Sequence, residues 1–298
     1  MKWDGNRESD NVEDRRGDDS GGDGGGGGGF GFGGRSVGIG TIVVALAVSY
    51  FFGINPLTVI NLMSGGSAPV APVVQHSPSR APVANDPAVH FVRVVLADTE
   101  DVWSALFREQ NATYVAPKLV LFSGSTATSC GQGQSATGPF YCPVDQKVYI
   151  DLSFYKLMRD RFHVDGEFAQ AYVIAHEVGH HVQNLMGISS KVDAARRRAG
   201  EVQSNALSVR LELQADCFAG VWAFHANEAR GILESGDVES ALNAATAIGD
   251  DALQRQAQGH VVPDSFTHGT SAQRVRWFKR GISTGKVTEC DTFKAAAL

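Results

Sequence analysis

The chain has 298 residues, of which 43% are hydrophobic and 9% aromatic, so it is long enough to bury a sizeable core. Its formal net charge is −6, and it has no run of Lys and Arg interleaved with aromatic residues, which gives nucleic-acid binding little support. The composition is uneven along the chain, and we expect the folded part to be shorter than the whole.

The first segment, residues 1–35, is acidic and then rich in glycine, with the run DDSGGDGGGGGGFGFGG. It holds almost no aliphatic side chains whose burial could offset the conformational entropy that is lost on ordering. We therefore predict a disordered, cytoplasmic tail over residues 1–35.

The next segment, residues 36–54 (SVGIGTIVVALAVSYFFGI), carries no charge over about nineteen residues, close to the roughly twenty that cross a bilayer as a helix. Basic residues precede it, but none follows until Arg80, and this asymmetry places the N-terminus in the cytoplasm. We therefore predict a single-pass protein of the cytoplasmic (inner) membrane with an extracytoplasmic, or periplasmic, domain. A cleaved signal peptide and a buried core helix are the alternatives.

A proline-rich stretch follows, with the sequence SGGSAPVAPVVQHSPSRAPVANDP at 64–87. Its prolines favour extended geometry and forbid a regular helix. We interpret residues 55–87 as a linker between membrane and domain. No internal repeat is visible, which leaves one domain at 88–298.

The domain begins with a predicted helix, VHFVRVVLADTEDVWSALFREQ, whose apolar residues follow helical spacing. Two short strands bounded by Gly, Ser, Pro or Asp come next, and the remainder is expected to be helical. A small N-terminal sheet followed by mostly helices is an α+β fold. The expected strands are 118–122 and 147–151, and the expected helices are 153–162, 167–186, 203–227, 237–258 and 270–282.

The four cysteines are Cys130, Cys142, Cys217 and Cys290, and none of them forms a C-x-x-C pair. In an extracytoplasmic domain an even number suggests disulfides. Cys130 and Cys142 flank a glycine-rich loop that they could close, and Cys217 and Cys290 would then tie a helix to the C-terminal segment. Three connectivities are possible, and four free buried thiols are the alternative.

The stretch AHEVGHHVQ, residues 175–183, places three histidines and a carboxylate within six positions. In a helix, His176 and His180 lie one turn apart on one face, so both imidazoles can bind one zinc ion. Glu177 is rotated by about 100 degrees, where its carboxylate can reach a water molecule on the metal. His181 points away from that face, and we expect it to pack behind the site.

The stretch LELQADCFAG, residues 211–220, places two carboxylates four residues apart among apolar neighbours. Acidic side chains are seldom buried without a partner. Glu212 could supply the third metal ligand, and Asp216 could accept a hydrogen bond from the second nitrogen of a ligating imidazole. A solvated acidic pair is the alternative.

Together the motifs HEVGHHVQ, ELQADCFAGVWA and HGTSAQRVRWF are similar to those of the YpfJ-like neutral zinc metallopeptidases of bacteria. The resemblance extends from the first residues, MKWDGNRESDNVEDRRG, to Gly281, apart from the linker. It implies a zincin-like fold, a single membrane span, His176 and His180 as zinc ligands, Glu177 as the catalytic base and Glu212 as the third ligand.

The stretch FTHGTSAQRV, residues 266–275, contains a histidine just before a predicted helix and an arginine in its first turns. We expect His268 to donate a hydrogen bond to the oxyanion that forms during hydrolysis. Arg274 would orient His268, or pair with Glu212 or Asp216. A loop histidine and a solvent-facing arginine are the alternatives.

These observations predict a membrane-anchored zinc metallopeptidase that hydrolyses extracytoplasmic proteins or peptides, with Zn²⁺ as cofactor and a peptide or protein as substrate. A zinc amidohydrolase that acts on cell-wall peptide is the second candidate. A non-catalytic, zinc-stabilised, membrane-tethered binding protein is the third. The extended segments before the active helix are candidates for an edge strand that pairs with substrate, or for an ordinary sheet strand. The sequence does not determine the oligomeric state.

Overall fold

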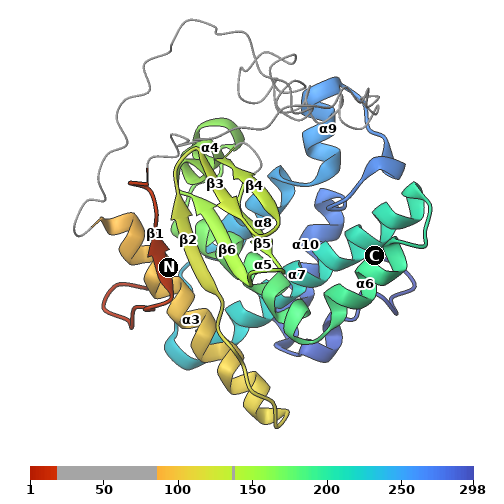
Figure 1. Ribbon diagram of the computed structural model, residues 1–298. Helices are drawn as coiled ribbons and strands as arrows, with labels where there is room; N and C mark the ends of the chain where they lie inside the picture. Colours follow the sequence, from red (N-terminus) through yellow and green to blue (C-terminus); the bar gives the residue numbers. More distant parts are fainter. Residues whose placement is uncertain (19–85, 136–137) are drawn as a thin grey trace, which may run out of the picture.

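A computed structural model describes residues 1–18, 86–135 and 138–298 of the chain. In these parts the fold is α+β, with a small sheet beside a larger group of helices (Figure 1). The N-terminus lies near α3, where Trp3 packs against Phe91.

The main sheet has four strands in the order β1-β2-β6-β5. Its first three strands are parallel, and β5 pairs antiparallel with β6 at one edge. A separate two-stranded hairpin is formed by β3 and β4. The strands are β1 Val12–Asp14, β2 Lys118–Phe122, β3 Ser125–Thr128, β4 Gly131–Gln134, β5 Phe140–Cys142 and β6 Lys147–Asp151.

The helices pack around α5, which contacts α3, α6, α7 and α8. Most residues of α5 are buried, so its apolar side chains supply much of the core. The helices are α3 Pro87–Glu109, α4 Ser153–Phe162, α5 Glu167–Leu185, α6 Ile188–Arg196, α7 Glu201–Arg230, α8 Asp237–Ala247, α9 Asp250–Gln258 and α10 Ser271–Thr284, with short 3-10 turns η2 Pro263–Ser265 and η3 Val287–Cys290.

Glycines let the helices that carry the motifs approach one another closely. A Cβ atom on Gly179 would lie 3.0 Å from the carbonyl oxygen of Ala215, so this glycine brings α5 against α7. A Cβ atom on Gly281 would lie only 2.0 Å from the carbonyl oxygen of Cys217, where α10 crosses α7. The HEVGH and ELQAD stretches are thereby held face to face.

Most predicted elements are confirmed. The strands at 118–122 and 147–151 and the helix at 153–162 have the predicted bounds, and the other helix ends differ by a few residues. The predicted helix at 237–258 is two helices, α8 and α9, because the chain breaks at Gly249. A Cβ atom there would lie 2.5 Å from the backbone nitrogen of Ser271.

The prediction of disorder over the whole of 1–35 is wrong for residues 1–18, which fold onto the domain. Val12 of β1 pairs with Leu119 of β2, and Trp3 packs against Phe91 of α3. The buried carboxylate of Glu100 accepts hydrogen bonds from this segment. Short polar segments without an apolar pattern can fold in this way when a preformed domain supplies their partners.

The predicted transmembrane helix and single-pass localisation are also corrected. No helix in the described ranges is long and apolar enough to cross a membrane, and the predicted span 36–54 lies outside them. The longest described helices contain buried charges and a metal-ligand motif rather than an unbroken apolar run. The predicted linker at 55–87 lies outside the described residues except for its last two positions.

Both disulfides that we expected are present. Cys130, in the turn between β3 and β4, bonds to Cys142 of β5, and Cys217 of α7 bonds to Cys290 of η3. Sequence alone had left three connectivities open.

Candidate metal centre

The HEVGH turn of α5 carries the histidines of the candidate centre. His176 and His180 are one helical turn apart, and their imidazole rings meet edge to face with centroids 4.8 Å apart. His176 is 7% exposed, and the side chain of His180 is 15% exposed. The predicted ligand pair is thus brought together, close to the surface but largely shielded from water.

Glu212 of α7 faces both rings. Its Oε2 atom lies 3.2 Å from Nε2 of His176 and 3.4 Å from Nε2 of His180. In a tetrahedral zinc site with bonds of about 2.1 Å, two ligand atoms lie about 3.4 Å apart. The ligand atoms of these three residues all lie within 4.8 Å of one another, so their spacing suits a zinc ion.

The second nitrogen of His176 is held by Asp216, whose Oδ1 atom lies 2.8 Å from Nδ1. Because an ionised carboxylate only accepts hydrogen bonds, Nδ1 donates to Asp216, and Nε2 is the nitrogen that faces Glu212 and the centre. This is the arrangement by which outer carboxylates orient metal-binding imidazoles. Asp216 therefore lies behind His176, within hydrogen-bonding distance of its second nitrogen.

Asp216 is fully buried and is neutralised by Arg274 of α10. Two guanidinium nitrogens of Arg274 donate to its two oxygens at 2.9 Å each, and Tyr172 donates to Oδ1 at 2.5 Å. Burial alone would raise the pKa of Asp216, but Arg274 and His176 outweigh it and lower the pKa to about 2. Asp216 is thus held as an anion behind His176.

The second nitrogen of His180 is held by an amide, with Nδ1 lying 2.9 Å from Oε1 of Gln183. Burial would lower the pKa of His180, but the carboxylates of Glu212 and Glu177 outweigh it and raise the pKa to about 9. Burial would likewise raise the pKa of Glu212, yet His180 and His176 hold it well below its ordinary value. Without a metal ion, a proton thus lies between the imidazole of His180 and the carboxylate of Glu212, at the position that a divalent cation would occupy.

Glu177 lies beside these ligands on α5 and is 7% exposed. Its carboxylate forms no hydrogen bond or ion pair with any other described residue, and it is not one of the clustered ligand atoms. It does act electrostatically on His180 and on the buried hydroxyl of Tyr155. An unpaired carboxylate next to a metal position is free to exchange protons with water.

His181 lies outside the cluster of His176, His180 and Glu212. It is fully buried, with Nε2 2.6 Å from the carbonyl oxygen of Val115 and Nδ1 3.0 Å from the hydroxyl of Tyr141. The carbonyl can only accept, so Nε2 donates to it and Tyr141 donates to Nδ1. His181 therefore fastens the edge strand β5 to the active helix.

His268 precedes α10 in a loop that is built around Asp250. The Oδ2 atom of Asp250 accepts hydrogen bonds from the backbone nitrogens of Thr267, His268 and Gly269, and its Oδ1 lies 3.3 Å from Nδ1 of His268. The side chain of His268 is 53% exposed. Its positive charge contributes to holding down the pKa of Glu212, after the larger effects of burial and the two ligand histidines.

The sequence left two roles open for Arg274, namely to orient His268 or to pair with Glu212 or Asp216. Arg274 pairs with Asp216 and donates to Tyr172, and the orientation of His268 falls to Asp250 instead. The capping box at Thr270, which accepts from the backbone nitrogen of Gln273, starts α10 where Arg274 can reach inward.

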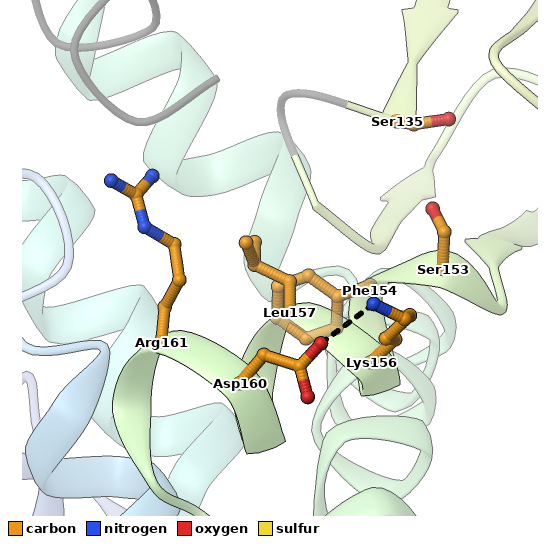
Figure 2. A pocket seen from close by; sticks show the side chains of 7 residues that line it. All are labelled: Ser135, Ser153, Phe154, Lys156, Leu157, Asp160 and Arg161. Atoms are coloured by element: carbon orange, nitrogen blue, oxygen red, sulfur yellow. Dashed lines mark hydrogen bonds and ion pairs between the residues drawn. The ribbon is translucent and has the colours of Figure 1, made fainter. Parts of the chain in front are cut away.

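A separate pocket of about 330 Å³ lies along α4 (Figure 2). It is lined by Ser135, Ser153, Phe154, Lys156, Leu157, Asp160 and Arg161, and none of the candidate metal ligands is among them. Lys156 and Asp160 already form an ion pair one helical turn apart, with Nζ 2.7 Å from Oδ2. We assign no role in the metal centre to this pocket.

Four residues that hold the site were not identified from the sequence. Tyr172 is four residues before His176, and Gln183 is three after His180, so helix spacing alone could have placed both on the metal face. Gln214 lies between Glu212 and Asp216, but nothing in its spacing pointed to a role. Asp250 gave no signal either, because its partners are backbone groups of a distant loop.

Comparison with known proteins gives the family. The chain matches the family described as "Putative neutral zinc metallopeptidase" over residues 1–293. The chain belongs to this family. A protein named YpfJ from Escherichia coli (strain K12) is 54% identical over 294 residues, which cover 98% of this chain and 99% of YpfJ. The proteins Mb2605 of Mycobacterium bovis and Rv2575 of Mycobacterium tuberculosis are each 42% identical over 221 residues, 71% of this chain and 74% of theirs. All three relatives are described as uncharacterized, and no solved structure matches the chain.

The zinc in the family's description agrees with the donor set. Two imidazoles and one carboxylate are the protein ligands of many catalytic zinc sites, which keep a fourth position open. Calcium or magnesium would favour a set made of oxygen atoms alone. The chemistry of His176, His180 and Glu212 therefore fits zinc.

Proposed function

We propose that the chain is a zinc-dependent peptidase that hydrolyses peptide bonds in proteins or peptides. The observation that carries the proposal is the convergence of His176, His180 and Glu212 beside the carboxylate of Glu177, which has no hydrogen-bonded or ion-pair partner among the described residues. The membership of a metallopeptidase family supports it. A site kept only for folding would not need an open side with a proton acceptor next to it.

A zinc ion bound by these three residues would lower the pKa of a water molecule and polarise the substrate carbonyl. Residues of the chain itself would transfer the proton and stabilise the negative oxygen. Glu177 accepts the proton of the attacking water and delivers it to the leaving amine. His268, whose Nδ1 lies 3.0 Å from Oγ1 of Thr267 and 3.3 Å from Oδ1 of Asp250, presents its other nitrogen as a donor to the oxygen that becomes negative.

The strand β5 is the proposed contact for the substrate backbone. It is at the edge of the sheet, and Tyr141 ties it to His181 on the active helix. Backbone groups on the free side of such a strand can pair with an extended peptide. This would hold a peptide across the face of α5 without demanding a particular sequence.

The decisive experiment compares the purified chain with Glu177→Gln and His180→Ala. Zinc measured by elemental analysis should be about one per chain in the wild type and in Glu177→Gln, and lost in His180→Ala. Cleavage of a peptide library should fall at least about a hundredfold in Glu177→Gln, because the proton acceptor is removed while the ligands remain.

Glu228→Gln is the matched control, since Glu228 is an exposed glutamate near the end of α7. It should retain full zinc and full activity. Equal cleavage by wild type and Glu177→Gln, or a wild type that binds no zinc, would refute the proposed function.

A further inference from the structure

A chain of buried amides leads away from the metal ligand His180. The Oε1 atom of Gln183 lies 2.9 Å from Nδ1 of His180, and its Nε2 atom lies 2.7 Å from the carbonyl oxygen of Leu211 and 3.1 Å from Oε1 of Gln214. Gln183 is fully buried, and Gln214 is 5% exposed. Two buried glutamine side chains in contact need a reason, because each must satisfy several polar groups away from water.

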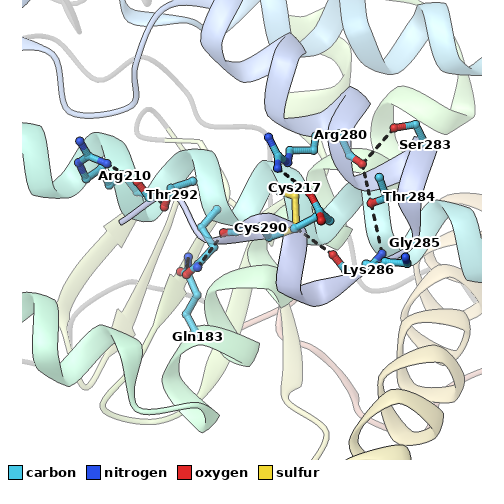
Figure 3. Close-up of a disulfide and its surroundings, with 12 residues drawn as sticks. Gln183, Arg210, Cys217, Arg280, Ser283, Thr284, Gly285, Lys286, Cys290 and Thr292 are labelled. Atoms are coloured by element: carbon cyan, nitrogen blue, oxygen red, sulfur yellow. Dashed lines mark hydrogen bonds and ion pairs between the residues drawn. A yellow bond between two sulfur atoms is a disulfide. The ribbon is translucent and has the colours of Figure 1, made fainter. Parts of the chain in front are cut away.

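The chain of amides ends at a disulfide. The Nε2 atom of Gln214 donates to the carbonyl oxygen of Cys290 at 3.0 Å, and Cys290 is bonded to Cys217 on α7. Figure 3 shows Gln183 beside the segment that carries Cys290, with the disulfide next to them. The last anchor is therefore a backbone carbonyl that the covalent bond holds against α7.

In this chain of amides, the groups at its ends determine which group donates and which accepts in every hydrogen bond. The carbonyls of Cys290 and Leu211 can only accept, so the NH₂ groups of Gln214 and Gln183 must face them. The oxygen of Gln183 must then face His180, and Nδ1 of His180 has to donate. Its Nε2 atom is left to face Glu212 and the metal position.

We propose that Gln183 and Gln214 are positioning residues that fix the ring and the metal-binding nitrogen of His180, with the disulfide-anchored carbonyl of Cys290 as their support. The inference rests on the proposed zinc site. His176 is oriented by the anion Asp216, whereas His180 is oriented by neutral amides, which gives the two ligands different outer partners.

The position of the disulfide explains why it belongs to this arrangement. Cys217 is on the same helix as Glu212, Gln214 and Asp216, so the bond attaches the C-terminal segment to the helix that carries one ligand and the supports of the other two. Both cysteines are fully buried. The bond therefore acts as a permanent support and not as a redox switch.

The test measures zinc affinity by competition with a chelator in the full chain. Gln183→Met and Gln214→Met keep the length of the side chain and remove its amide, and each should weaken zinc binding by about tenfold to a hundredfold. Replacing both Cys217 and Cys290 by Ala should weaken it too. Adding Gln214→Met to that variant should cause little further loss, because both changes remove the same support.

Arg210→Met is the matched control. Arg210 donates to the carbonyls of Thr292 and Ala295 in the same C-terminal segment but takes no part in the chain of amides. It should lower stability and leave zinc affinity within about twofold of the wild type. Replacing Cys130 and Cys142 by Ala controls for the loss of a disulfide in general.

Nuclear magnetic resonance of the zinc-loaded wild type adds a readout that needs no variant. His180 should bind zinc through Nε2 and show an Nδ1 proton that exchanges slowly with water. Coordination through Nδ1, a rapidly exchanging Nδ1 proton, or folded variants with wild-type affinity would overturn the inference. If the wild type binds no zinc at all, the proposed function fails instead, and the two failures are thus distinct.

Discussion

Arg274 and Asp216 form a fully buried ion pair behind the candidate metal centre, with Nε and Nη2 of the guanidinium each 2.9 Å from a carboxylate oxygen. The pair joins α10 to α7, and Asp216 also orients His176. Removing one member leaves the other charge buried without a partner, which costs about 3 to 5 kcal/mol. The carboxylate of Asp216 thus contributes both to the stability of the fold and to the orientation of a candidate metal ligand.

We therefore expect Asp216→Asn to lower the free energy of unfolding by about 3 to 5 kcal/mol and to weaken zinc binding by about tenfold to a hundredfold. Urea unfolding and chelator competition measure the two effects. Asp98→Asn is the control, because Asp98 of α3 is a buried partner of Trp222 and Arg230 of α7 and does not contact the candidate ligands. It should lose stability without losing zinc affinity, and equal zinc loss in both variants would contradict the role of Asp216.

The regular elements were predictable because their signals are local. The strand at 147–151 has alternating apolar residues, and the helix at 153–162 has clear boundaries. The HEVGH turn is likewise local, since a helix alone brings His176 and His180 together. Glu212 required one further step, the argument that a buried acid needs a partner.

The parts that were missed depend on contacts between distant segments. Residues 1–18 have a composition typical of a disordered tail, and only their partners on α3 and β2 order them. Asp250 meets His268 through a loop 18 residues further along the chain. The direction of the amides at Gln183 depends on the carbonyl of Cys290. No pattern within a short window contains this information.

The docking of the N-terminal segment depends on Glu100, which is 8% exposed. Its carboxylate accepts from Ser9 Oγ at 2.5 Å, Asn11 Nδ2 at 2.8 Å and Arg7 Nη2 at 3.0 Å. Glu100→Gln should lower the free energy of unfolding by about 1 to 3 kcal/mol and expose residues 1–18 to proteolysis, because charged acceptors are lost. Limited proteolysis followed by mass spectrometry measures this.

Asp101→Asn is the control for that experiment. Asp101 also pairs with Arg7, at 2.7 Å, but its side chain is 44% exposed, and such surface pairs contribute at most about 1 kcal/mol. It should leave residues 1–18 protected. If Glu100→Gln also leaves them protected, the buried carboxylate does not hold the segment.

Acid should loosen the same segment through Glu13 of β1, whose Oε1 atom lies 3.0 Å from Nζ of Lys147. Burial would raise the pKa of Glu13, but Lys147 and Arg15 outweigh it and lower the pKa from 4.5 to about 2. A carboxylate with a depressed pKa stabilises the fold above its unfolded pKa and loses that contribution as pH falls through the folded value. The window is therefore pH 4.5 down to about 2.

Over that window we expect Glu13 to account for about 1 to 2 kcal/mol of the lost stability, since its partial exposure weakens the pairing. Denaturant unfolding at a series of pH values measures it in the wild type and in Glu13→Gln. The variant should be less stable near neutral pH and should lose less between pH 4.5 and 2. Parallel curves for the two proteins would show that Glu13 makes no such contribution.

The loop that holds His268 sets up the last prediction. Asp250 receives three backbone N–H groups of residues 267–269, which fixes the loop, and its second oxygen lies 3.3 Å from Nδ1 of His268. These hydrogen bonds hold the loop backbone, while the ring of His268 remains half exposed. A fixed imidazole with one free nitrogen is suited to stabilise negative charge on a substrate oxygen.

If the proposed peptidase activity is confirmed, His268→Ala should keep zinc and fold and lose about 2.7 to 4 kcal/mol of transition-state stabilisation, mainly as a lower kcat. Asp250→Asn retains the ring but weakens its support, so its kcat should fall less. His260→Ala, which removes an exposed loop histidine, is the control and should change nothing. Steady-state kinetics and zinc analysis decide the outcome. An unchanged kcat in His268→Ala would remove this residue from the reaction, and a loss of zinc along with activity would make it a metal ligand instead.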